Sequence, residues 1–307
     1  MTQNPDNSRN ILAVTAVAAP ARTELPAELG DILASAGVGE KQLRILSDGG
    51  AWQACEYVFD VWGDGGVDAV RDALKGLEAD VAVLPAANRR KRLLISDMDS
   101  TIIGQECLDE LADFAGLKAE VSAITERAMR GELDFEGALT TRVAMLKGLE
   151  LSALEAAYRE RITLNPGART LTATMKAHGA HAVLVSGGFT FFTSRVADLS
   201  GFDAHRGNTL VDDGAALTGD VGRPILGREA KLTALDEASA AHGLTRDDAL
   251  ALGDGANDLD MIRAAGLGIA YRAKPIVAEQ ASAAISHTDL TAALFFQGYA
   301  ASEFVAG

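Results

Sequence analysis

Acidic and hydroxyl side chains stand directly after three apolar runs that we predict to be buried strands. These positions are Asp97 and Asp99 after Leu93–Ser96, Ser186 after Ala182–Val185, and Asp254 after Ala249–Gly253. In an open sheet of parallel strands the carboxyl ends meet at one edge, where ligands bind. Closely spaced carboxylates can act as nucleophiles, as proton donors and acceptors, and as ligands for a hard cation. The pattern therefore predicts one polar site at this edge.

A cation belongs to the same ordered set of residues. Lys231 lies at the start of the predicted helix Glu229–Ala241, one unit before Asp254. An isolated lysine on a helix is usually a solvated surface residue. Its place between Ser186 and Asp254 instead indicates a group that neutralises negative charge in the site.

Other interpretations of these motifs fit the residues less well. A calcium loop that begins at Asp97 would need Asp or Asn at its fifth position and Gly at its sixth, where the chain has Thr101 and Ile102. The run from Gly253 starts like a dinucleotide fingerprint, but its last glycine is replaced by Asp258, which would repel a pyrophosphate. Ser186 lacks the preceding glycine of a nucleophile elbow.

The ordered motifs resemble those of haloacid dehalogenase-type phosphatases, and in particular of the phosphoserine phosphatases. They are Asp97-Met98-Asp99-Ser100-Thr101, Glu106, Met129–Glu136, Arg142, Val185–Phe189, Lys231 and Gly253–Asp258. The resemblance covers about residues 93–290. It implies hydrolysis of O-phosphoserine to serine and phosphate, the last step of serine biosynthesis, through an aspartyl-phosphate intermediate.

The resemblance also implies roles for residues around the phosphate. Asp97 would be the nucleophile, and Asp99 would protonate the leaving oxygen and then accept a proton from water. Mg²⁺ would be held by Asp97, Asp254 and the backbone carbonyl of Asp99. Lys231, the Ser186 hydroxyl, the Gly187 N–H and Asn257 would bind phosphate, and Asp258 would support the metal ligands.

The segment that follows the predicted strand Leu93–Ser96 is expected to select the substrate. By resemblance, Glu106 would pair with the substrate ammonium and Arg142 with its carboxylate. Phe135 and Met129 would form an apolar wall that excludes water. Taken singly, the two charged residues would be ordinary surface charges, and the two apolar residues would be ordinary core residues.

The predicted fold class is α/β. Residues 93–307 read as a doubly wound parallel sheet of the haloacid dehalogenase-like type, with a helical cap inserted at about 105–165. Four amphipathic stretches without strand-like runs predict the cap helices: Cys107–Ala115, Lys118–Arg130, Phe135–Leu146 and Ser152–Arg161.

Residues 1–88 predict a separate ferredoxin-like βαββαβ domain. The element order resembles the ACT-like domain of some bacterial phosphoserine phosphatases. Because such domains bind amino acids at dimer interfaces, serine or another amino acid and a second copy of the chain are candidate partners. The basic run at 89–92 is interpreted as a solvated linker between the domains.

Composition excludes several classes of protein. The 307 residues carry a net charge of −15, which disfavours nucleic acid and anionic membranes as partners. No run approaches the length of a membrane span. Cys55 and Cys107 form neither a disulfide framework nor a metal motif, so a reducing, cytoplasmic location is expected. Ile11–Ala19 resembles the core of a signal peptide, but a buried first strand is the better interpretation.

Two functional alternatives stay open at this stage. The same chemistry could serve another small phosphorylated metabolite or transfer the phosphoryl group to a second alcohol. The chain could also act through its first domain as an amino-acid-sensing regulatory module.

Overall fold

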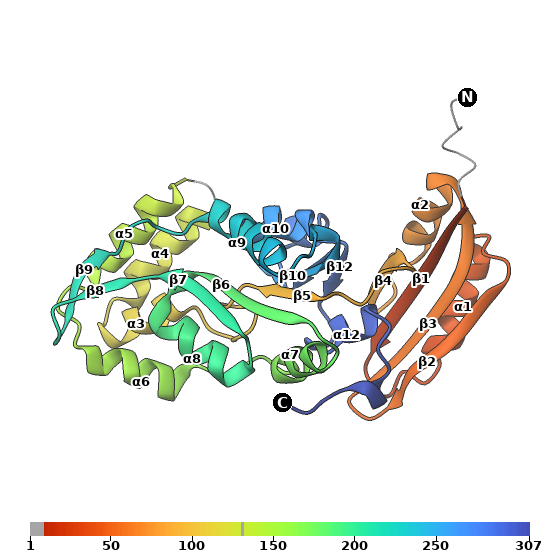
Figure 1. Ribbon diagram of the computed structural model, residues 1–307, viewed down its shortest axis with the longest axis horizontal. Helices are drawn as coiled ribbons and strands as arrows, with labels where there is room; N and C mark the ends of the chain where they lie inside the picture. Colours follow the sequence, from red (N-terminus) through yellow and green to blue (C-terminus); the bar gives the residue numbers. More distant parts are fainter. Residues whose placement is uncertain (1–8, 130–131) are drawn as a thin grey trace.

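One long mixed sheet runs through the molecule (Figure 1). The computed structural model describes residues 9–129 and 132–307. Within these residues, ten strands lie in the order β2-β3-β1-β4-β12-β11-β10-β5-β6-β7. The first four strands belong to the N-terminal section, and the other six form the section that holds the predicted catalytic residues, the catalytic section.

The N-terminal section has the predicted βαββαβ order. Its elements are β1 (Arg9–Ala18), α1 (Leu25–Ser35), β2 (Lys41–Gly49), β3 (Trp52–Trp62), α2 (Gly63–Ala73) and β4 (Asp80–Pro85). Each neighbouring pair of these strands is antiparallel, with β1 and β3 in the centre, as in a ferredoxin-like sheet. The hairpin between β2 and β3 turns at Gly49 and Gly50, with φ of 95° and 77°, values that favour glycine.

The six strands of the catalytic section are parallel to one another. They are β5 (Leu93–Ser96), β6 (His181–Phe189), β7 (Ala204–Asn208), β10 (Ala249–Gly253), β11 (Leu267–Tyr271) and β12 (Ala283–Ile285). From β5 the chain proceeds through β6 to β7 on one side, and β10 through β12 lie on the other. The strand order therefore reverses between β5 and β10, the place where open α/β sheets bind ligands.

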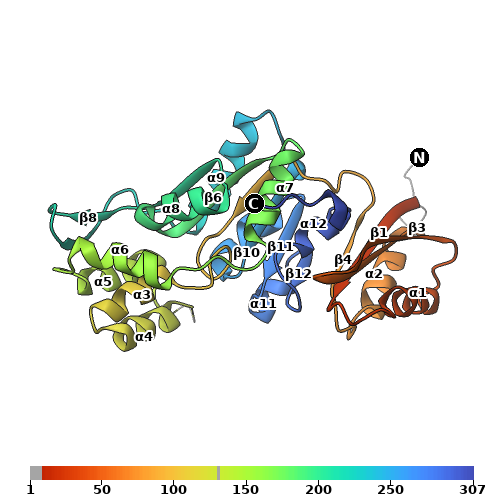
Figure 2. The same ribbon diagram turned by 90° about the horizontal axis from the view of Figure 1, so that it is seen from below.

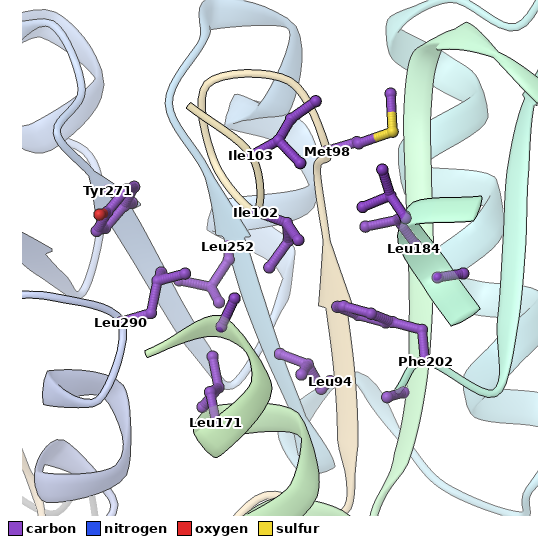
Figure 3. Close-up of a cluster of buried hydrophobic side chains, with 14 of the residues drawn as sticks. Leu94, Met98, Ile102, Ile103, Leu171, Leu184, Phe202, Leu252, Tyr271 and Leu290 are labelled. Atoms are coloured by element: carbon purple, nitrogen blue, oxygen red, sulfur yellow. The ribbon is translucent and has the colours of Figure 1, made fainter. Parts of the chain in front are cut away.

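Helices cover both faces of this parallel sheet, as a doubly wound fold requires. One face packs against α7 (Ala168–Ala177), α8 (Thr190–Ser200) and α12 (Ala292–Phe296), and the other against α9 (Arg228–Ala241) and α10 (Leu259–Ala264). Because side chains alternate along a strand, Leu94 faces the first layer whereas Leu93 and Ile95 face the second. Figure 3 shows the first layer, where Leu94, Leu184 and Leu252 belong to one cluster of buried side chains.

A helical cap follows β5. It consists of α3 (Cys107–Phe114), α4 (Lys118–Met129), α5 (Phe135–Met145) and α6 (Leu151–Arg161), close to the four predicted stretches. A hairpin of β8 (Leu210–Asp212) and β9 (Leu217–Val221), which the sequence did not predict, also joins the cap (Figure 2). Leu217 exchanges backbone hydrogen bonds with Gly148 and Leu149.

The N-terminal and catalytic sections share their sheet through β4 and β12, which pair at Ala82 and Ala283. Asp80 strengthens this junction. Its buried carboxylate accepts hydrogen bonds from the backbone N–H groups of Ser286, His287 and Thr288 at 2.6, 3.0 and 2.8 Å. The two sections are therefore joined by backbone pairing and by a buried anion.

The basic run 89–92, interpreted as a solvated linker, is only partly solvated: the Arg90 and Arg92 side chains are exposed, whereas those of Arg89 and Lys91 are largely buried. Arg89 forms an ion pair with the fully buried Glu56, and Lys91 donates to the carbonyls of Asn88 and Asp247, each at 2.7 Å. Arg90 pairs with Glu303 and Arg92 with Asp248. The sequence pattern hid these contacts because the partners lie far away in the chain.

Within the described part of the chain, no helix is both long and apolar enough to cross a bilayer.

Replacing Asp80 with Asn should destabilise the whole chain. An amide offers one acceptor and turns its NH₂ toward backbone donors, so the free energy of unfolding should fall by about 2 kcal/mol. Urea denaturation measures this change. Asp72→Asn, on the exposed face of α2, is the matched control and should leave the midpoint unchanged; an equal midpoint for Asp80→Asn would contradict the anchoring role.

Candidate functional site

The predicted site residues from separate strands meet at the point where the strand order reverses. Asp97 directly follows β5, and Asp254 directly follows the neighbouring strand β10. Ser186 lies near the end of β6, and Lys231 lies in the first turn of α9. The doubly wound topology thus converts distant sequence positions into neighbours.

Lys231 is buried between two carboxylates. Its Nζ lies 2.7 Å from Oδ1 of Asp97 and 2.5 Å from Oδ1 of Asp258, and the three side chains are between 0% and 8% exposed. Burial lowers the pKa of Lys231, but attraction and hydrogen bonding by Asp258 and Asp97 outweigh it, so the net shift is upward. Lys231 therefore stays protonated as the fixed cation of the site.

Asp97, Asp254 and Asp258 together outnumber this cation. One oxygen of each carboxylate lies within 4.8 Å of the corresponding oxygens of the other two. Burial, followed by repulsion from Asp258, raises the pKa of Asp254 to about 6. The same two causes raise the pKa of Asp97, against the attraction of Lys231. The site therefore holds excess negative charge that a bound cation would relieve.

The donor set fits a hard divalent cation. Among the described residues, no hydrogen bond reaches the second oxygen of Asp97 or of Asp254; their first oxygens accept from Met98 N and from Thr101 Oγ1. Asp258 is engaged at both oxygens, by Lys231 and by the Gly255 N–H. Asp97 and Asp254 thus offer free oxygen ligands, which suit Mg²⁺, while Asp258 holds the lysine and the loop.

Asp99 is fixed on both oxygens. Its Oδ1 accepts from the Cys107 N–H at 2.8 Å, and its Oδ2 accepts from the Ser186 hydroxyl at 2.9 Å. The Ser186 oxygen in turn accepts from the Gly188 N–H at 2.7 Å. Asp99 therefore links the start of the cap to the loop at the end of β6.

Close approach explains the two glycines of this loop. A Cβ on Gly188 would lie 2.9 Å from Oδ2 of Asp99, and a Cβ on Gly187 would lie 3.0 Å from the ring of Phe135. A Cβ on Gly227, in the loop before α9, would meet the same ring at 3.4 Å. Phe135 thus packs from the cap against two backbone segments of the catalytic section, and its part in an apolar wall around a substrate stays a prediction.

Glu106 and Arg142 come to one side of the site from different cap helices. Glu106 caps the start of α3 and accepts from the Ser100 hydroxyl at 2.6 Å. Burial first, and then repulsion from Asp99, raise the pKa of Glu106 to about 8. Burial lowers the pKa of Arg142, against attraction from Asp109, Glu106 and Asp99. A titratable carboxyl group and a guanidinium therefore share one partly buried environment beside Asp99.

Two further residues predicted to contribute to the site are Asn257 and Met129. Asn257 lies on the turn after β10, next to Asp258, and its contact with a phosphate stays a prediction. The side chain of Met129 lies outside the described residues, so its expected place in the apolar wall also stays a prediction.

Several groups that hold the site together were not predicted from the sequence. Ser100, at φ 55°, binds Glu106, and Thr101 binds Asp254. Both stand in the recognised motif, so their position was the signal. The backbone N–H of Cys107 carried no signal, because a residue's side-chain type does not report where its amide points.

The model of the haloacid dehalogenase-like hydrolase family matches residues 94–263. This span is more than half of the chain and contains the carboxylates, Ser186 and Lys231. The chain is a haloacid dehalogenase-like hydrolase. The predicted fold class is therefore confirmed.

Relatives of this hydrolase carry more specific names. A phosphoserine phosphatase of Polaromonas sp. (strain JS666) is 47% identical over 220 residues, 70% of this chain and 93% of the relative. The solved structure of a probable phosphoserine phosphatase from Vibrio cholerae, in unliganded form, has a TM-score of 0.72 at 29% identity and covers 99% of this chain and 90% of its own. A phospho-aspartyl intermediate analogue of phosphoserine phosphatase has a TM-score of 0.63 at 40% identity, over 67% of this chain and 99% of its own.

Replacing Lys231 with Met should both destabilise and inactivate this hydrolase. Without the ammonium, two buried carboxylates lose their partner, so the free energy of unfolding should fall by roughly 3–5 kcal/mol. Urea denaturation and a phosphatase assay measure the two effects. Lys118→Met, at a half-exposed cap position, is the control, and unchanged stability of Lys231→Met would contradict the buried ion-pair assignment.

The pKa of Glu106 predicts a pH dependence of stability without divalent cations. The folded-state pKa of about 8 exceeds the ordinary value of 4.5, so between these values the folded chain keeps a proton that the unfolded chain loses. The free energy of unfolding should therefore decrease as the pH rises from about 5 to 8.

Urea titrations across this pH range test the assignment. Glu106→Gln should make the decrease shallower, because the amide does not titrate. Glu110→Gln, on the same helix α3, should retain the slope. An equal slope in the Glu106→Gln protein would assign the dependence to other groups.

Proposed function

We propose that this hydrolase is a phosphoserine phosphatase, which converts O-phosphoserine and water to serine and phosphate. One observation carries the proposal: Asp97, paired with Lys231 at 2.7 Å, lies beneath a cap that holds the carboxyl group of Glu106 and the guanidinium of Arg142. A phosphate site below, with a carboxyl group and a guanidinium above, matches a phosphorylated amino acid, whose ammonium would favour the ionised form of Glu106. The names of the relatives support the same substrate.

Asp97 is the nucleophile of the proposed reaction. A carboxylate oxygen attacks phosphorus while the bond from phosphorus to the serine oxygen breaks, which leaves an aspartyl-phosphate and serine. Lys231 supports this step because it balances charge on Asp97 and on the transferred phosphoryl group. The Ser186 hydroxyl and the Gly187 N–H bind phosphoryl oxygens.

Asp99 moves the protons. In the first step its carboxyl group donates a proton to the leaving serine oxygen; in the second its carboxylate accepts a proton from the water that attacks the aspartyl-phosphate. Phosphate then leaves, and both aspartates return to their starting states. The hydrogen bond from the Cys107 N–H holds Asp99 in one orientation for both steps, whereas the Ser186 hydroxyl turns its one hydrogen from Asp99 to the phosphoryl group.

Mg²⁺ is the proposed cation of the site. Asp97 and Asp254 would hold it through their free oxygens, together with the backbone carbonyl of Asp99. When bound, it supplies positive charge that allows an anionic phosphate to approach the carboxylates.

Substrate selection rests on the cap. Glu106 pairs with the ammonium of the substrate, and Arg142 pairs with the carboxylate. Phe135, packed against Gly187, excludes water from the phosphoryl group. A sugar phosphate offers neither charge, so its hydrolysis should be slow.

The N-terminal section receives a structural role in this proposal. Its contacts through Asp80, Arg89 and β4 attach it to the catalytic section. Binding of serine or another amino acid to this section, a homodimer and a cytoplasmic location stay predictions. Calorimetry of the full chain with serine and with glycine tests the first of them.

Replacing Asp97 with Asn should abolish release of phosphate from O-phosphoserine and leave the chain folded. An amide is a poor nucleophile, and the substitution removes one charge from a cluster that has an excess. The measurement is phosphate release with Mg²⁺ present, accompanied by mass spectrometry of acid-quenched enzyme. The wild type should carry a phosphoryl group on the peptide that contains Asp97.

Two outcomes would contradict separate parts of the proposal. Turnover by the folded Asp97→Asn protein would exclude Asp97 as the nucleophile. A wild type that hydrolyses a sugar phosphate as efficiently as O-phosphoserine would keep the nucleophile but change the substrate. Asp113→Asn, on the surface of α3, is the matched control and should retain activity.

A further inference from the structure

Arg142 of α5 is bound on two of its three nitrogens. Its Nε donates to the backbone carbonyl of Ala138 at 3.1 Å, and its Nη1 donates to Oγ1 of Thr125 on α4 at 2.9 Å. Within the described residues, no hydrogen bond occupies Nη2. A guanidinium held in this way has little freedom to rotate, so its open edge points in one direction.

Thr125 is held within its own helix α4 and lies against the helix α3. Its Oγ1 lies 3.1 Å from the carbonyl of Val121 and 3.5 Å from Oδ1 of Asp109 on α3. The other oxygen of Asp109 accepts from the Ser122 hydroxyl at 3.1 Å. Asp109 therefore connects α3 to α4, and Thr125 connects α4 to the guanidinium on α5.

Asp109 stands one helical turn after Glu106, the group that faces the substrate ammonium in the proposed function. Its charge attracts Arg142 and repels Glu106. The spacing between the two substrate-binding charges is thus set through α3, Asp109 and Thr125. This arrangement also limits the geometry of recognition: because Nε is engaged with Ala138, a carboxylate must meet the Nη1–Nη2 end of the guanidinium.

We propose that Thr125 and Asp109 are positioning residues that orient Arg142 toward the carboxylate of the substrate. Neither residue touches the substrate; both act through the guanidinium. The inference rests on the proposed function, because it takes Arg142 as the group that binds the substrate carboxylate.

The test compares two substrates that differ in one group. O-phosphoethanolamine has the phosphate and the ammonium of O-phosphoserine but lacks its carboxylate. Thr125→Val removes the hydroxyl and keeps the branched shape, so the KM for O-phosphoserine should rise about tenfold with little change in kcat. The KM for O-phosphoethanolamine should change less than about twofold. Thr125→Ser restores the hydroxyl and should restore the KM for O-phosphoserine.

Matched variants separate positioning from folding. Thr141→Val is the control, because Thr141 is an exposed residue of α5 whose hydroxyl donates to the carbonyl of Gly137; it should leave both KM values unchanged. Asp109→Asn should raise the KM for O-phosphoserine by about threefold, because the side chain beside Thr125 keeps its shape but loses its negative charge. Thermal melts show whether each variant is folded. If the Thr125→Val protein is unfolded, the Thr125→Ser and Asp109→Asn proteins test the inference.

The Arg142→Met background decides whether Thr125 acts through the guanidinium. If it does, adding Thr125→Val to Arg142→Met should not raise the KM further. An equal rise in both backgrounds, or an equal rise for both substrates, would overturn the positioning role. If Arg142→Met itself leaves the KM for O-phosphoserine unchanged, the proposed substrate contact is wrong; if it raises the KM and Thr125→Val does not, only the positioning role is wrong.

Discussion

The buried contact of Lys231 with Asp97 and Asp258 is the constraint on which the rest of the site depends. One cation lies among three carboxylates, counting Asp254, whose oxygens approach within 4.8 Å. Such a cluster is costly to bury unless its charges are paired. The fold meets part of this cost with the lysine and with N–H and hydroxyl donors, and it leaves oxygens on Asp97 and Asp254 for a divalent cation. The acidity that would repel a phosphate is thus what makes a metal site possible.

Topology brings this cluster together, and the cap completes it. The reversal of strand order between β5 and β10 puts Asp97 beside Asp254, while α9 brings Lys231 from the far face of the sheet. Above them the cap supplies opposite charges on α3 and α5 and the ring of Phe135. The β8–β9 hairpin extends from the catalytic section to the cap. The cap is therefore attached to the sheet through this hairpin as well as through the two chain segments that enter and leave it. The same sheet continues into the N-terminal section through β4, where Asp80 accepts hydrogen bonds from Ser286, His287 and Thr288, and Glu56 on β3 accepts one from Arg89.

The sequence was a good guide wherever a pattern is local. The pattern of apolar residues predicted the strands in both sections of the sheet, and helical periodicity predicted the bounds of the four cap helices to within a few residues. It missed the buried contacts of Arg89 and Lys91 in the basic run 89–92, interpreted as solvated, because Glu56 and Asp247 are distant in the chain and nothing local marks them as partners. It also missed the β8–β9 hairpin, whose short strands are fixed by backbone bonds to the cap and carry only a weak pattern of their own.

The amino-acid sequence by itself determined the chemistry that is available to this hydrolase: which carboxylates follow which strands, which lysine precedes the last of them, and which glycines allow close approach. Only the tertiary structure decided how those groups are used. It bound Asp258 to Lys231 and left Asp97 and Asp254 with free oxygens, it clamped Asp99 between Cys107 N and Ser186, and it oriented Arg142 through Thr125. Residue type and order are properties of the chain, whereas the direction of a side chain or an amide depends on neighbours that become close only when the chain folds.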